Sequence, residues 1–361
     1  MPTPLARADL LSRVQRVVDS ELTRQGQVLA QIGPDMEPLV DLVASLLQGG
    51  KRLRAACAYW GYRAVGGSDG EPIVRLATAM EFFQAAALLH DDVMDDSDTR
   101  RGQPAAHRSM ASRHTAGGWD GDSDRFGQGA AILAGNLCLT WTDALYATSG
   151  LPGEELRRAR GTFDLMRTQL MGGQYLDLLG AARPWKTSSA AERIAQARRV
   201  IRFKSAKYTV EHPLLVGALA GGAGPADLAA LSDYGLALGE AFQLRDDLLG
   251  VFGDPSATGK PAGDDLREGK RTVLIAEFLD AADAGPRALL GERLGRPDLS
   301  STQIDELRDV IRGSGAVERV EARIEVGAQQ ARVALCRTER LDPEALAVLD
   351  ELVEAATIRE A

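Results

Sequence analysis

Five aspartates occur within eight residues in the stretch Leu88–Gly102, which reads LLHDDVMDDSDTRRG and continues into two arginines. The stretch follows an apolar run that is typical of a helix. Carboxylates so close together repel one another, and beside apolar turns their charge is costly unless a partner compensates it. A hard divalent cation with oxygen ligands would compensate it. The residue types and their spacing therefore predict a metal site at the end of a helix.

A second acidic helix end lies about 155 residues further along the chain, where Asp246 and Asp247 occur near the end of a long apolar run. If the two helices are neighbours in a bundle, both acidic ends face one cavity. Magnesium suits such a site, because it takes few carboxylates and keeps water and substrate phosphates as its other ligands. The sequence therefore favours magnesium held between two remote segments.

Basic residues near these segments can hold the phosphate oxygens that a metal leaves open. Three cations at Lys51–Arg54 follow a glycine pair at a helix start, where positive charge opposes the macrodipole, and this favours a bound anion. The apolar helix turns beneath the aspartates would accept a hydrocarbon tail. The chemistry thus predicts a substrate with a diphosphate head and an apolar tail. The expected phosphate-holding residues are Lys51, Arg54, Arg100, Arg101, Lys204 and Lys260.

Long helices must position these groups. The helix expected over Glu71–Asp96 carries a stripe on one face, apolar at its start and acidic at its end. The members of the stripe are Met80, Gln84, Ala87, Asp91 and Asp95. Further helices are expected over Leu5–Ile32, Met36–Leu47, Phe126–Thr148, Glu154–Leu179, Ala190–Leu219 with a kink at Pro213, and Leu228–Phe252. Long connections are expected over Ser97–Gly129 and Gly253–Lys270.

The composition favours one all-helical domain over residues 1–361, with 45% hydrophobic but only 5% aromatic residues. A net charge of −9 excludes a general nucleic-acid surface. The three cysteines are far apart and show no metal-ligand spacing, which indicates a reduced compartment. No run reaches the length of a membrane span. We therefore expect a cytoplasmic protein with no transmembrane segment.

Six motifs follow one another in the order GGKRLR, DDxxD with a following RRG, GGQxxD, KS, FQxxDD and TGK. From about Leu42 onward the chain resembles the trans-isoprenyl diphosphate synthases, or polyprenyl synthetases, most closely a bacterial geranylgeranyl diphosphate synthase. The resemblance implies an all-α isoprenoid synthase-type bundle around a central apolar cavity. It also implies a homodimer and catalysis with three magnesium ions. The implied reaction joins isopentenyl diphosphate to an allylic diphosphate and releases pyrophosphate.

The resemblance also implies roles for individual residues. The implied metal ligands are Asp91, Asp95 and Asp246, with Asp92 in support. The implied allylic diphosphate site contains Arg100, Lys204 and Lys260. The implied isopentenyl diphosphate site contains Lys51, Arg54, Gln84 and Arg101. The groups implied to face the allylic carbocation are Ser205 and Gln243. The GQxxD helix is matched by Gln174 and Asp177, and Asp177 is expected near the lysine and metal network.

The chain departs from the family pattern at several positions. Gly250 stands where the second motif usually has its last aspartate, and Ala55 replaces the usual proline after GGKRLR. Asn136 stands where many members have aspartate. The first aspartate of the second motif is the chief ligand in the family, so we expect metal binding to survive.

Product length depends on the helix before Asp91. Ala86 and Ala87 are too small to close the cavity, whereas Phe82 and Phe83 lie one turn deeper. A turn rises about 5.4 Å, close to one isoprene unit. We therefore expect geranylgeranyl diphosphate as the product, with farnesyl or longer polyprenyl products as alternatives if other helices form the floor.

Three other interpretations were weighed. A class I terpene cyclase would need a second metal motif of a different form, which the sequence lacks. A non-catalytic regulatory subunit of a prenyltransferase would be expected to lose metal aspartates or cations, which this chain keeps. A calcium loop at Asp120–Asp124 is excluded, because Arg125 replaces the required glycine and Ala131 the final glutamate.

Overall fold

The computed structural model describes residues 9–185, 188–254, 263–338 and 340–357. Within these ranges the regular secondary structure is helical apart from one hairpin of two short strands, β1 (Thr99–Arg100) and β2 (Gln103–Pro104). The expected all-α fold class is confirmed. Contacts group the chain into two compact units, which are described in turn. The expectation of a single domain over residues 1–361 stays a prediction.

Unit 1 draws on Met1–Gly161, Pro213–Ala223 and Asp342–Ala345. It contains the first part of α7, which spans Gly153–Ala182 and passes into unit 2. Its other helical elements are α1 (Leu10–Ala30), η2 (Pro34–Met36), α2 (Glu37–Leu47), α3 (Leu53–Ala64), α4 (Glu71–Met94), α5 (Ala106–Ala116), α6 (Ser123–Ala147) and α9 (His212–Gly221).

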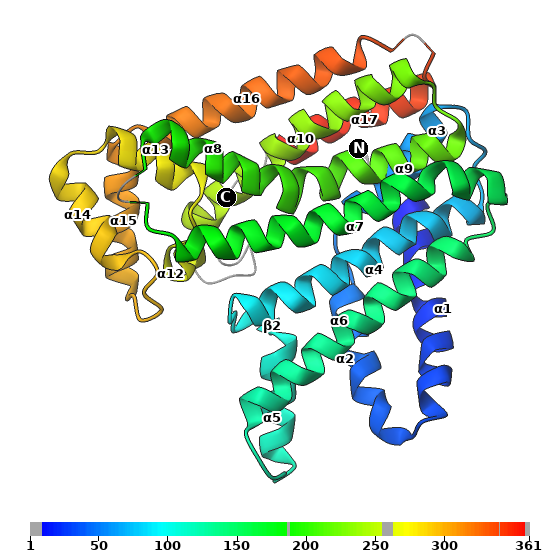
Figure 1. Ribbon diagram of the computed structural model, residues 1–361, viewed down its shortest axis with the longest axis horizontal. Helices are drawn as coiled ribbons and strands as arrows, with labels where there is room; N and C mark the ends of the chain where they lie inside the picture. The colour runs from blue at the N-terminus through cyan, green and yellow to red at the C-terminus, as the bar shows by residue number, and fades with distance from the viewer. Residues whose placement is uncertain (1–8, 186–187, 255–262, 339, 358–361) are drawn as a thin grey trace. The chain divides into compact units, whose positions relative to one another are not determined.

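Helix α4 is the core element of unit 1. It packs along α6 and against α3, α1 and α2 (Figure 1). Phe82 of α4 is fully buried and meets the ring of Trp141 of α6 edge-on, with ring centroids 6.2 Å apart. On α3 the backbone of α9 comes so close that a Cβ at Gly61 would overlap a carbonyl oxygen of Leu214. Burial on several faces explains why α4 is apolar nearly all round.

Unit 2 draws on Thr162–His212, Gly224–Leu341 and Leu346–Ala361. Besides the second part of α7, its helical elements are α8 (Ala190–Val200), η3 (Ile201–Glu211), α10 (Pro225–Phe252), α12 (Asp264–Glu268), α13 (Val273–Ala281), α14 (Ala284–Arg293), α15 (Ser301–Gly313), α16 (Ala316–Leu335) and α17 (Pro343–Thr357).

Helix α10 is the corresponding core element of unit 2, and it packs against η3 on one side and α16 on another (Figure 1). Two glycines let α10 approach η3. A Cβ at Gly235 would lie 2.6 Å from the Cα of Glu211, and a Cβ at Gly239 would lie 2.6 Å from the Cα of Ala206. Because no side chain separates the two backbones at these glycines, α10 and η3 pack closely against each other.

The helix expected over Ala190–Leu219 is present without a break over residues 190–221, but it is not a single α-helix. The structure divides the segment into α8, the π-helix η3 and α9. A π-helix makes i→i+5 hydrogen bonds and is rare over more than one turn. Pro213 lies at the junction of η3 and α9 inside continuous helix, where its missing N–H removes one helical hydrogen bond. The kink expected there stays a prediction.

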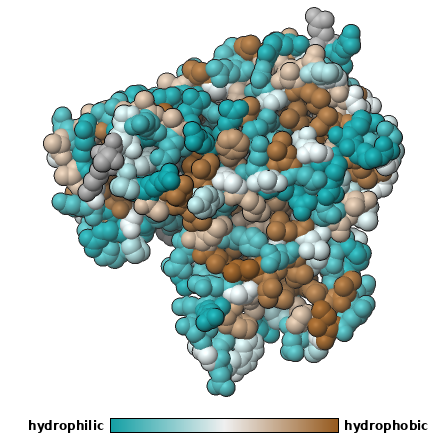
Figure 2. All heavy atoms as spheres, viewed as in Figure 1, coloured by the Kyte–Doolittle hydropathy of each residue, from teal (hydrophilic) through white to brown (hydrophobic). Residues whose placement is uncertain are grey.

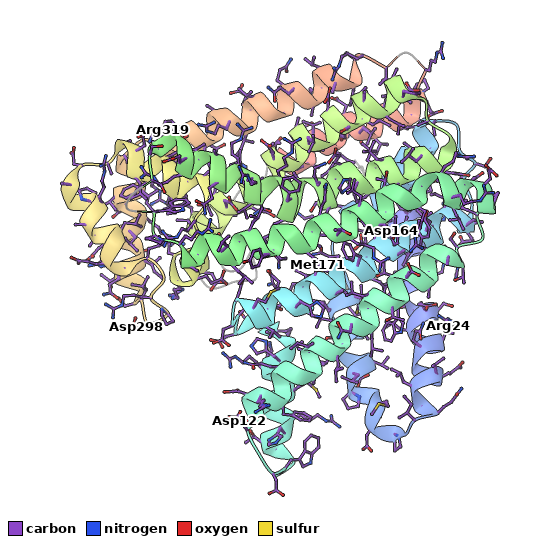
Figure 3. The ribbon with its side chains drawn as sticks, in the orientation of Figure 1. Arg24, Asp122, Asp164, Met171, Asp298 and Arg319 are labelled. Carbon is purple, nitrogen blue, oxygen red and sulfur yellow. The ribbon has the colours of Figure 1, made fainter. Side chains whose placement is uncertain are left out.

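The long connection expected over Ser97–Gly129 is also wrong, because it holds the hairpin, α5 and the start of α6. Helix α5 has few large apolar residues, so its periodicity is weak, yet it packs closely on α6. Asp122 caps α6 by accepting a hydrogen bond from the backbone N–H of Arg125 at 3.0 Å (Figure 3). The aspartate-rich segment therefore begins a helix, in agreement with the exclusion of a calcium loop.

One helix in the described part of the chain, α4, is long and apolar enough to cross a membrane by length and composition alone. Buried residues make up 72% of its apolar window. The same burial is what the core helix of a globular unit requires, and α4 ends in charged aspartates. Its apolar character is therefore explained by packing within unit 1.

Candidate active site: two acidic helix ends and their cations

An arginine of the hairpin compensates part of the charge at the acidic end of α4. Asp92 is buried, and Nε of Arg100 donates a hydrogen bond to its Oδ1 at 2.9 Å. A guanidinium nitrogen of Arg100 also lies 3.9 Å from Oδ2 of Asp91. The side chain of Asp91 is 17% exposed, against 3% for Asp92. Of this pair, Asp91 is therefore the one whose carboxylate reaches solvent.

A tight turn brings Arg100 back onto α4. Arg100 pairs with Gln103 across the hairpin, so Arg101 and Gly102 form a two-residue loop. Both loop residues have positive φ, 54° and 74°, as a type I′ turn requires. The sequence RRG therefore does two things: its first arginine pairs with the acidic helix end, and the next two residues make the turn.

Arg101 belongs to a group of cations that follows α2. Its Nη1 donates to two backbone carbonyl oxygens at the end of α2, at 3.1 and 3.3 Å. Burial lowers the pKa of Arg101, and the nearby guanidinium groups of Arg52, Arg100 and Arg54 lower it further. The guanidinium groups of Arg52, Arg54, Arg100 and Arg101 are thus close enough to repel one another, and the charge of Glu81 offsets part of this repulsion. A bound anion such as a diphosphate would relieve the repulsion.

Arg52 faces the protein interior instead of solvent. It has a left-handed φ of 52°, donates to Oε1 of Gln15 at 2.7 Å and pairs with the buried Glu81 at 3.4 Å. Oε1 of Glu81 also accepts from the backbone N–H of Ala55 at 3.0 Å. That N–H lies in the first turn of α3 and has no partner within the helix. A proline at position 55 has no N–H to donate, so this departure from the family pattern has a structural use.

In unit 2, Lys204 of η3 pairs with Asp177 of α7, with Nζ and Oδ2 2.5 Å apart. The structure thus joins these two residues as expected. Gly173 permits the approach, because a Cβ there would lie 2.5 Å from the backbone nitrogen of Lys204. Ser205 is buried beside it. A π-helix that carries two predicted site residues agrees with the frequent occurrence of such segments at functional sites.

At the acidic end of α10 the buried aspartate has an amide as its hydrogen-bond donor, where that of α4 has an arginine. Asp247 is buried, and Nε2 of Gln243 donates to its Oδ1 at 2.8 Å, whereas its Oδ2 has no hydrogen-bond partner. Burial, and then the nearby charge of Asp265, raises the pKa of Asp247 to about 8. Asp246 adds a further negative charge. An amide donor therefore holds the buried aspartate of this end in place.

The donor atoms at both helix ends fit magnesium, which takes oxygen ligands. Among the residues described, no three His, Cys, Asp or Glu side chains form a group able to hold a metal ion by themselves. Magnesium usually needs only one or two carboxylates, with water and substrate phosphates completing its shell. The unpartnered Oδ2 of Asp247 and the nearby carboxylates of Asp265 and Asp246 fit a cation that a phosphorylated substrate helps to bind.

The predicted residues fall into two sets. The set in unit 1 is Lys51, Arg54, Phe82, Phe83, Gln84, Ala86, Ala87, Asp91, Asp92, Asp95, Arg100 and Arg101. The set in unit 2 is Gln174, Asp177, Lys204, Ser205, Gln243 and Asp246. Lys260 lies outside the described residues. The roles of these residues, and the convergence of Asp91 with Asp246, stay predictions.

Three residues at these sites escaped the sequence reasoning, namely Glu81, Asp265 and Lys270. Glu81 is an acid inside an apolar helical run, and this is a signal for a buried ion pair. Asp265 and Lys270 pair with each other at 3.3 Å. The sequence could have indicated this pair, because an aspartate and a lysine stand five residues apart after the second acidic motif. That segment had been interpreted only as a polar loop.

The chain matches the family described as polyprenyl synthetase over residues 37–311. All the predicted site residues lie within that range, including both acidic helix ends. The match therefore covers the same segments that chemistry alone singled out.

Relatives of known activity point the same way. A geranylfarnesyl diphosphate synthase of Aeropyrum pernix is 31% identical over 85% of this chain and 89% of its own. A geranylgeranyl diphosphate synthase of Mycobacterium tuberculosis is 32% identical over 76% and 74%. A crystal structure of the geranylgeranyl pyrophosphate synthase from Corynebacterium glutamicum, complexed with isoprenyl diphosphate and magnesium, is 39% identical, with a TM-score of 0.92 over 98% of this chain and 100% of that one. Because the family match and these relatives span both acidic helix ends and their cations, the chain belongs to the polyprenyl synthetase family.

Proposed function

We propose that this prenyltransferase extends an allylic diphosphate with isopentenyl diphosphate to geranylgeranyl diphosphate and releases pyrophosphate. The observation that carries the proposal is the presence of an acidic helix end in each unit together with cations in both, the arginines after α2 and in the hairpin of unit 1 and Lys204 in unit 2. A cyclase acts on one diphosphate substrate, whereas two cationic sets suit two. The similarity to geranylgeranyl diphosphate synthases supports the product.

Magnesium is the proposed cofactor, with three ions per site as in the family. Asp91 and Asp95 would hold it from α4, with Asp92 in support, and Asp246 would hold it from α10. When bound, magnesium supplies positive charge that favours departure of the diphosphate. Arg100 keeps Asp92 in place from the side, so the helix end is ordered before a substrate arrives.

Two sets of cations would hold the two substrates. Isopentenyl diphosphate is assigned to the cations near the end of α2, which Arg101 joins from the hairpin. The residues of that site are Lys51, Arg54, Gln84 and Arg101. The allylic diphosphate is assigned to Arg100, Lys204 and Lys260. The pairing of Lys204 with Asp177 supports this, because it fixes the direction of the long lysine side chain.

Ionisation of the allylic C–O bond would begin the reaction, and the double bond of isopentenyl diphosphate would then attack the carbocation. The proton lost afterwards would pass to the released pyrophosphate. Gln243 suits a place beside the carbocation, because its amide N–H is taken by Asp247 and its carbonyl oxygen is the end left to face positive charge. Ser205 is the second group proposed there.

Four residues of α4 are proposed to set product length. Phe82 and Phe83 are fully buried, which suits a fixed floor, and Ala86 is small and buried one turn nearer Asp91. Replacing Ala86 with Phe should shorten the product by about one isoprene unit, the rise of one helix turn. Ala85→Phe is the matched control, because it overpacks the same helix on a different face. An unchanged product from Ala86→Phe would reject the role of Ala86, Ala87 and the two phenylalanines.

The test of the activity is incubation of the purified chain with magnesium, isopentenyl diphosphate and each allylic diphosphate in turn, followed by chromatography of the products. Geranylgeranyl diphosphate is the expected end product. A farnesyl or longer product would keep the reaction and change the assigned length. No product from the chain alone, with a changed product from an added prenyltransferase, would favour a regulatory subunit instead.

A homodimer is the proposed assembly. Helix α6 exposes Ile132 and Leu133 by 43% and 57%, although apolar residues of this size are usually buried. Figure 2 shows apolar surface among polar surface over the face where Figure 1 draws α6. Light scattering after gel filtration would test the dimer, and Leu133→Glu should weaken it.

The cytoplasm is the proposed location, and the buried unpaired thiols of Cys57 and Cys138 support a reducing compartment.

A further inference from the structure

The segment between α2 and the first turn of α3 carries two of the cations proposed for isopentenyl diphosphate, Lys51 and Arg54. Its backbone has left-handed φ at three positions, 67° at Gly49, 89° at Gly50 and 52° at Arg52. Glycine tolerates this conformation, whereas in a residue with a side chain it costs free energy and persists only where surrounding contacts hold it. The conformation of Arg52 therefore requires contacts from outside the segment.

The start of α3 lacks the groups that usually stabilise a helix N-terminus. Among the described residues, the N-cap residue Arg52 makes no capping hydrogen bond with its side chain, and the first turn contains no acid. The cations at this end oppose the helix dipole. A carboxylate from another element would correct both deficits, because it can accept from an N–H of the first turn and supplies negative charge.

Glu81 of α4 supplies that carboxylate. Its Oε1 accepts from the backbone N–H of Ala55 in the first turn of α3 at 3.0 Å, and its Oε2 accepts from Nη1 of Arg52 at 3.4 Å. The side chains of Glu81 and Arg52 are only 7% and 5% exposed. The two oxygens of one buried carboxylate therefore hold residues 52 and 55, and Arg54 lies between these residues in the sequence.

Further contacts restrict the same segment. Nη2 of Arg52 donates to Oε1 of Gln15 on α1 at 2.7 Å and to the carbonyl oxygen of Leu47, the last residue of α2. Burial lowers the pKa of Arg101, and so does the charge of Arg52, whereas the charge of Glu81 raises it. Glu81 therefore holds the start of α3 by direct contact and also attracts a neighbouring cation.

We propose that Glu81 is a positioning residue for isopentenyl diphosphate, which caps α3 from α4 and so fixes the segment that carries Lys51 and Arg54. Gln84, another residue proposed for that site, lies three residues after Glu81 and shares its face of α4. The same helix thus places one residue of the site directly and two through α3. The inference rests on the proposed function for the identity of the ligand.

The attachment through residue 55 depends on a departure of this chain from the family pattern. The proline that the family usually has at position 55 carries no N–H, so it could not donate to Glu81. With Ala55 the carboxylate holds both ends of the segment.

Position and charge predict opposite effects when Glu81 loses its carboxylate. A buried negative charge repels an anionic substrate, so by charge alone its removal would strengthen the binding of isopentenyl diphosphate. Loss of the attachment would instead let the start of α3 shift, which weakens that binding. The direction of the change therefore separates the two roles.

The first experiment compares the kinetics of the wild-type chain with those of Glu81→Gln, which keeps the shape of the side chain. An amide has one accepting oxygen, so it cannot accept from both Arg52 and the N–H of Ala55 as the carboxylate does. We expect the KM for isopentenyl diphosphate to rise about 10-fold, with the KM for the allylic diphosphate and kcat changed by less than about 2-fold. Calorimetric titration with isopentenyl diphosphate alone should show the same loss of affinity.

Glu277→Gln is the matched control. Glu277 is a buried glutamate of α13 that pairs with Arg319 and Arg323 at 2.9 and 2.6 Å, so the same substitution disturbs a similar arrangement in unit 2. It should lower the melting temperature and leave both KM values unchanged. An unchanged or lower KM for isopentenyl diphosphate in folded Glu81→Gln would overturn the proposal, and so would an equal rise for both substrates.

The second experiment tests whether Glu81 acts through the start of α3. Ala55→Pro removes only the N–H, and it should raise the KM for isopentenyl diphosphate about 5-fold or less, the effect of one hydrogen bond. In the Ala55→Pro background, Glu81→Gln should cost less affinity than in the wild-type background, because one of its two contacts is already absent. Additive effects would overturn the proposed route. If Glu81→Gln does not fold, Ala55→Pro decides alone, and an unchanged KM for isopentenyl diphosphate in that variant would overturn the proposal.

Product formation by the wild-type chain is measured in parallel. Normal product formation, with affinity for isopentenyl diphosphate that does not depend on Glu81, would reject this inference and leave the proposed function in place. No product, with affinity for isopentenyl diphosphate that does depend on Glu81, would reject the proposed function and keep the positioning role.

Discussion

The acidic ends of α4 and α10 look alike in sequence but differ in how their charge is compensated. At the end of α4 the buried Asp92 has a guanidinium partner, Arg100, from the hairpin that follows. At the end of α10 the buried Asp247 accepts from the amide of Gln243, and the charges near it are those of Asp265, Asp246 and, with opposite sign, Lys270. The buried aspartate of the first end therefore has a charged hydrogen-bond donor, and that of the second end has a neutral one.

This difference shows that an aspartate motif alone does not determine how its charges are compensated. The motif places carboxylates at a helix end, and the elements packed around it supply the hydrogen-bond donors for each of them. Arg100 holds the carboxylate of Asp92 in place, so that residue supports the helix end while Asp91 reaches solvent. The buried carboxylate of Asp247 accepts from a neutral amide, and its Oδ2 has no hydrogen-bond partner among the described residues. We therefore expect the second end to depend more on a bound metal than the first.

The largest effect expected is on turnover. Asp91→Ala and Asp246→Ala should each lower kcat by about 100- to 1,000-fold or more, the scale found when one electrostatic stabiliser of a transition state is removed. Steady-state kinetics with both substrates checks this, and circular dichroism should show an intact fold. Asp298→Ala is the control, because its carboxylate pairs with Arg296 on the surface. Near-normal turnover in either variant would reject the assignment of that helix end.

The sequence was sufficient for the parts of the molecule that follow helical periodicity. The long helices α4 and α10 occur within a few residues of the expected ranges, because an apolar run with an acidic end is a strong local pattern. The pairing of Lys204 with Asp177 was also expected, from the motifs that carry them. In these cases the information lies within one segment or in an order of motifs.

Other features depend on contacts between remote segments and could not be read from one window of sequence. The π-helix η3 has no periodicity that separates it from an α-helix over a few turns, and its widening is matched by glycines on α7 and α10. Helix α5 is too polar to be recognised without α6 beneath it. The approach of Asp265 to Gly250 joins two elements across a segment that read as a loop. From the sequence, only Gly250 could be recognised, as a departure from the family's second aspartate motif.

The second prediction tests the guanidinium at the end of α4. Arg100→Ala should destabilise the fold by about 3–5 kcal/mol, because it leaves the charge of the buried Asp92 without its partner. Urea unfolding checks this. Arg108→Ala is the control, because its partners Asp96 and Asp98 are 69% and 81% exposed. Its cost should be about 1 kcal/mol or less. Equal losses would mean that burial does not distinguish the two arginines, and the comparison would fail.

The third prediction tests the amide at the end of α10. Gln243→Met keeps the volume of the side chain and removes its hydrogen bond to Asp247. The cost should be about 1 kcal/mol, well below that of Arg100→Ala, because an amide donor is lost and not a cation. Urea unfolding of both variants, in buffer without divalent ions, compares the two helix ends directly. A loss from Gln243→Met as large as that from Arg100→Ala would show that both ends are compensated alike.

The smallest loss of stability is expected from replacing Ala55, whose backbone N–H donates a hydrogen bond to the buried carboxylate of Glu81. Ala55→Pro removes the N–H that donates to Glu81, but Arg52 remains as a partner of that carboxylate. The lost bond costs about 1 kcal/mol, and the stiffer unfolded chain offsets about 0.4–1 kcal/mol of it. The net loss in urea unfolding should therefore be below about 1 kcal/mol.

Ala56→Pro is the contrast, because the N–H of Ala56 makes a helical bond to the carbonyl of Arg52 at 2.9 Å. A proline that breaks such a bond costs about 3 kcal/mol or more. A large loss from Ala55→Pro would show that Glu81 depends on the backbone donor more than on Arg52, and that unit 1 does not rely on guanidinium partners throughout.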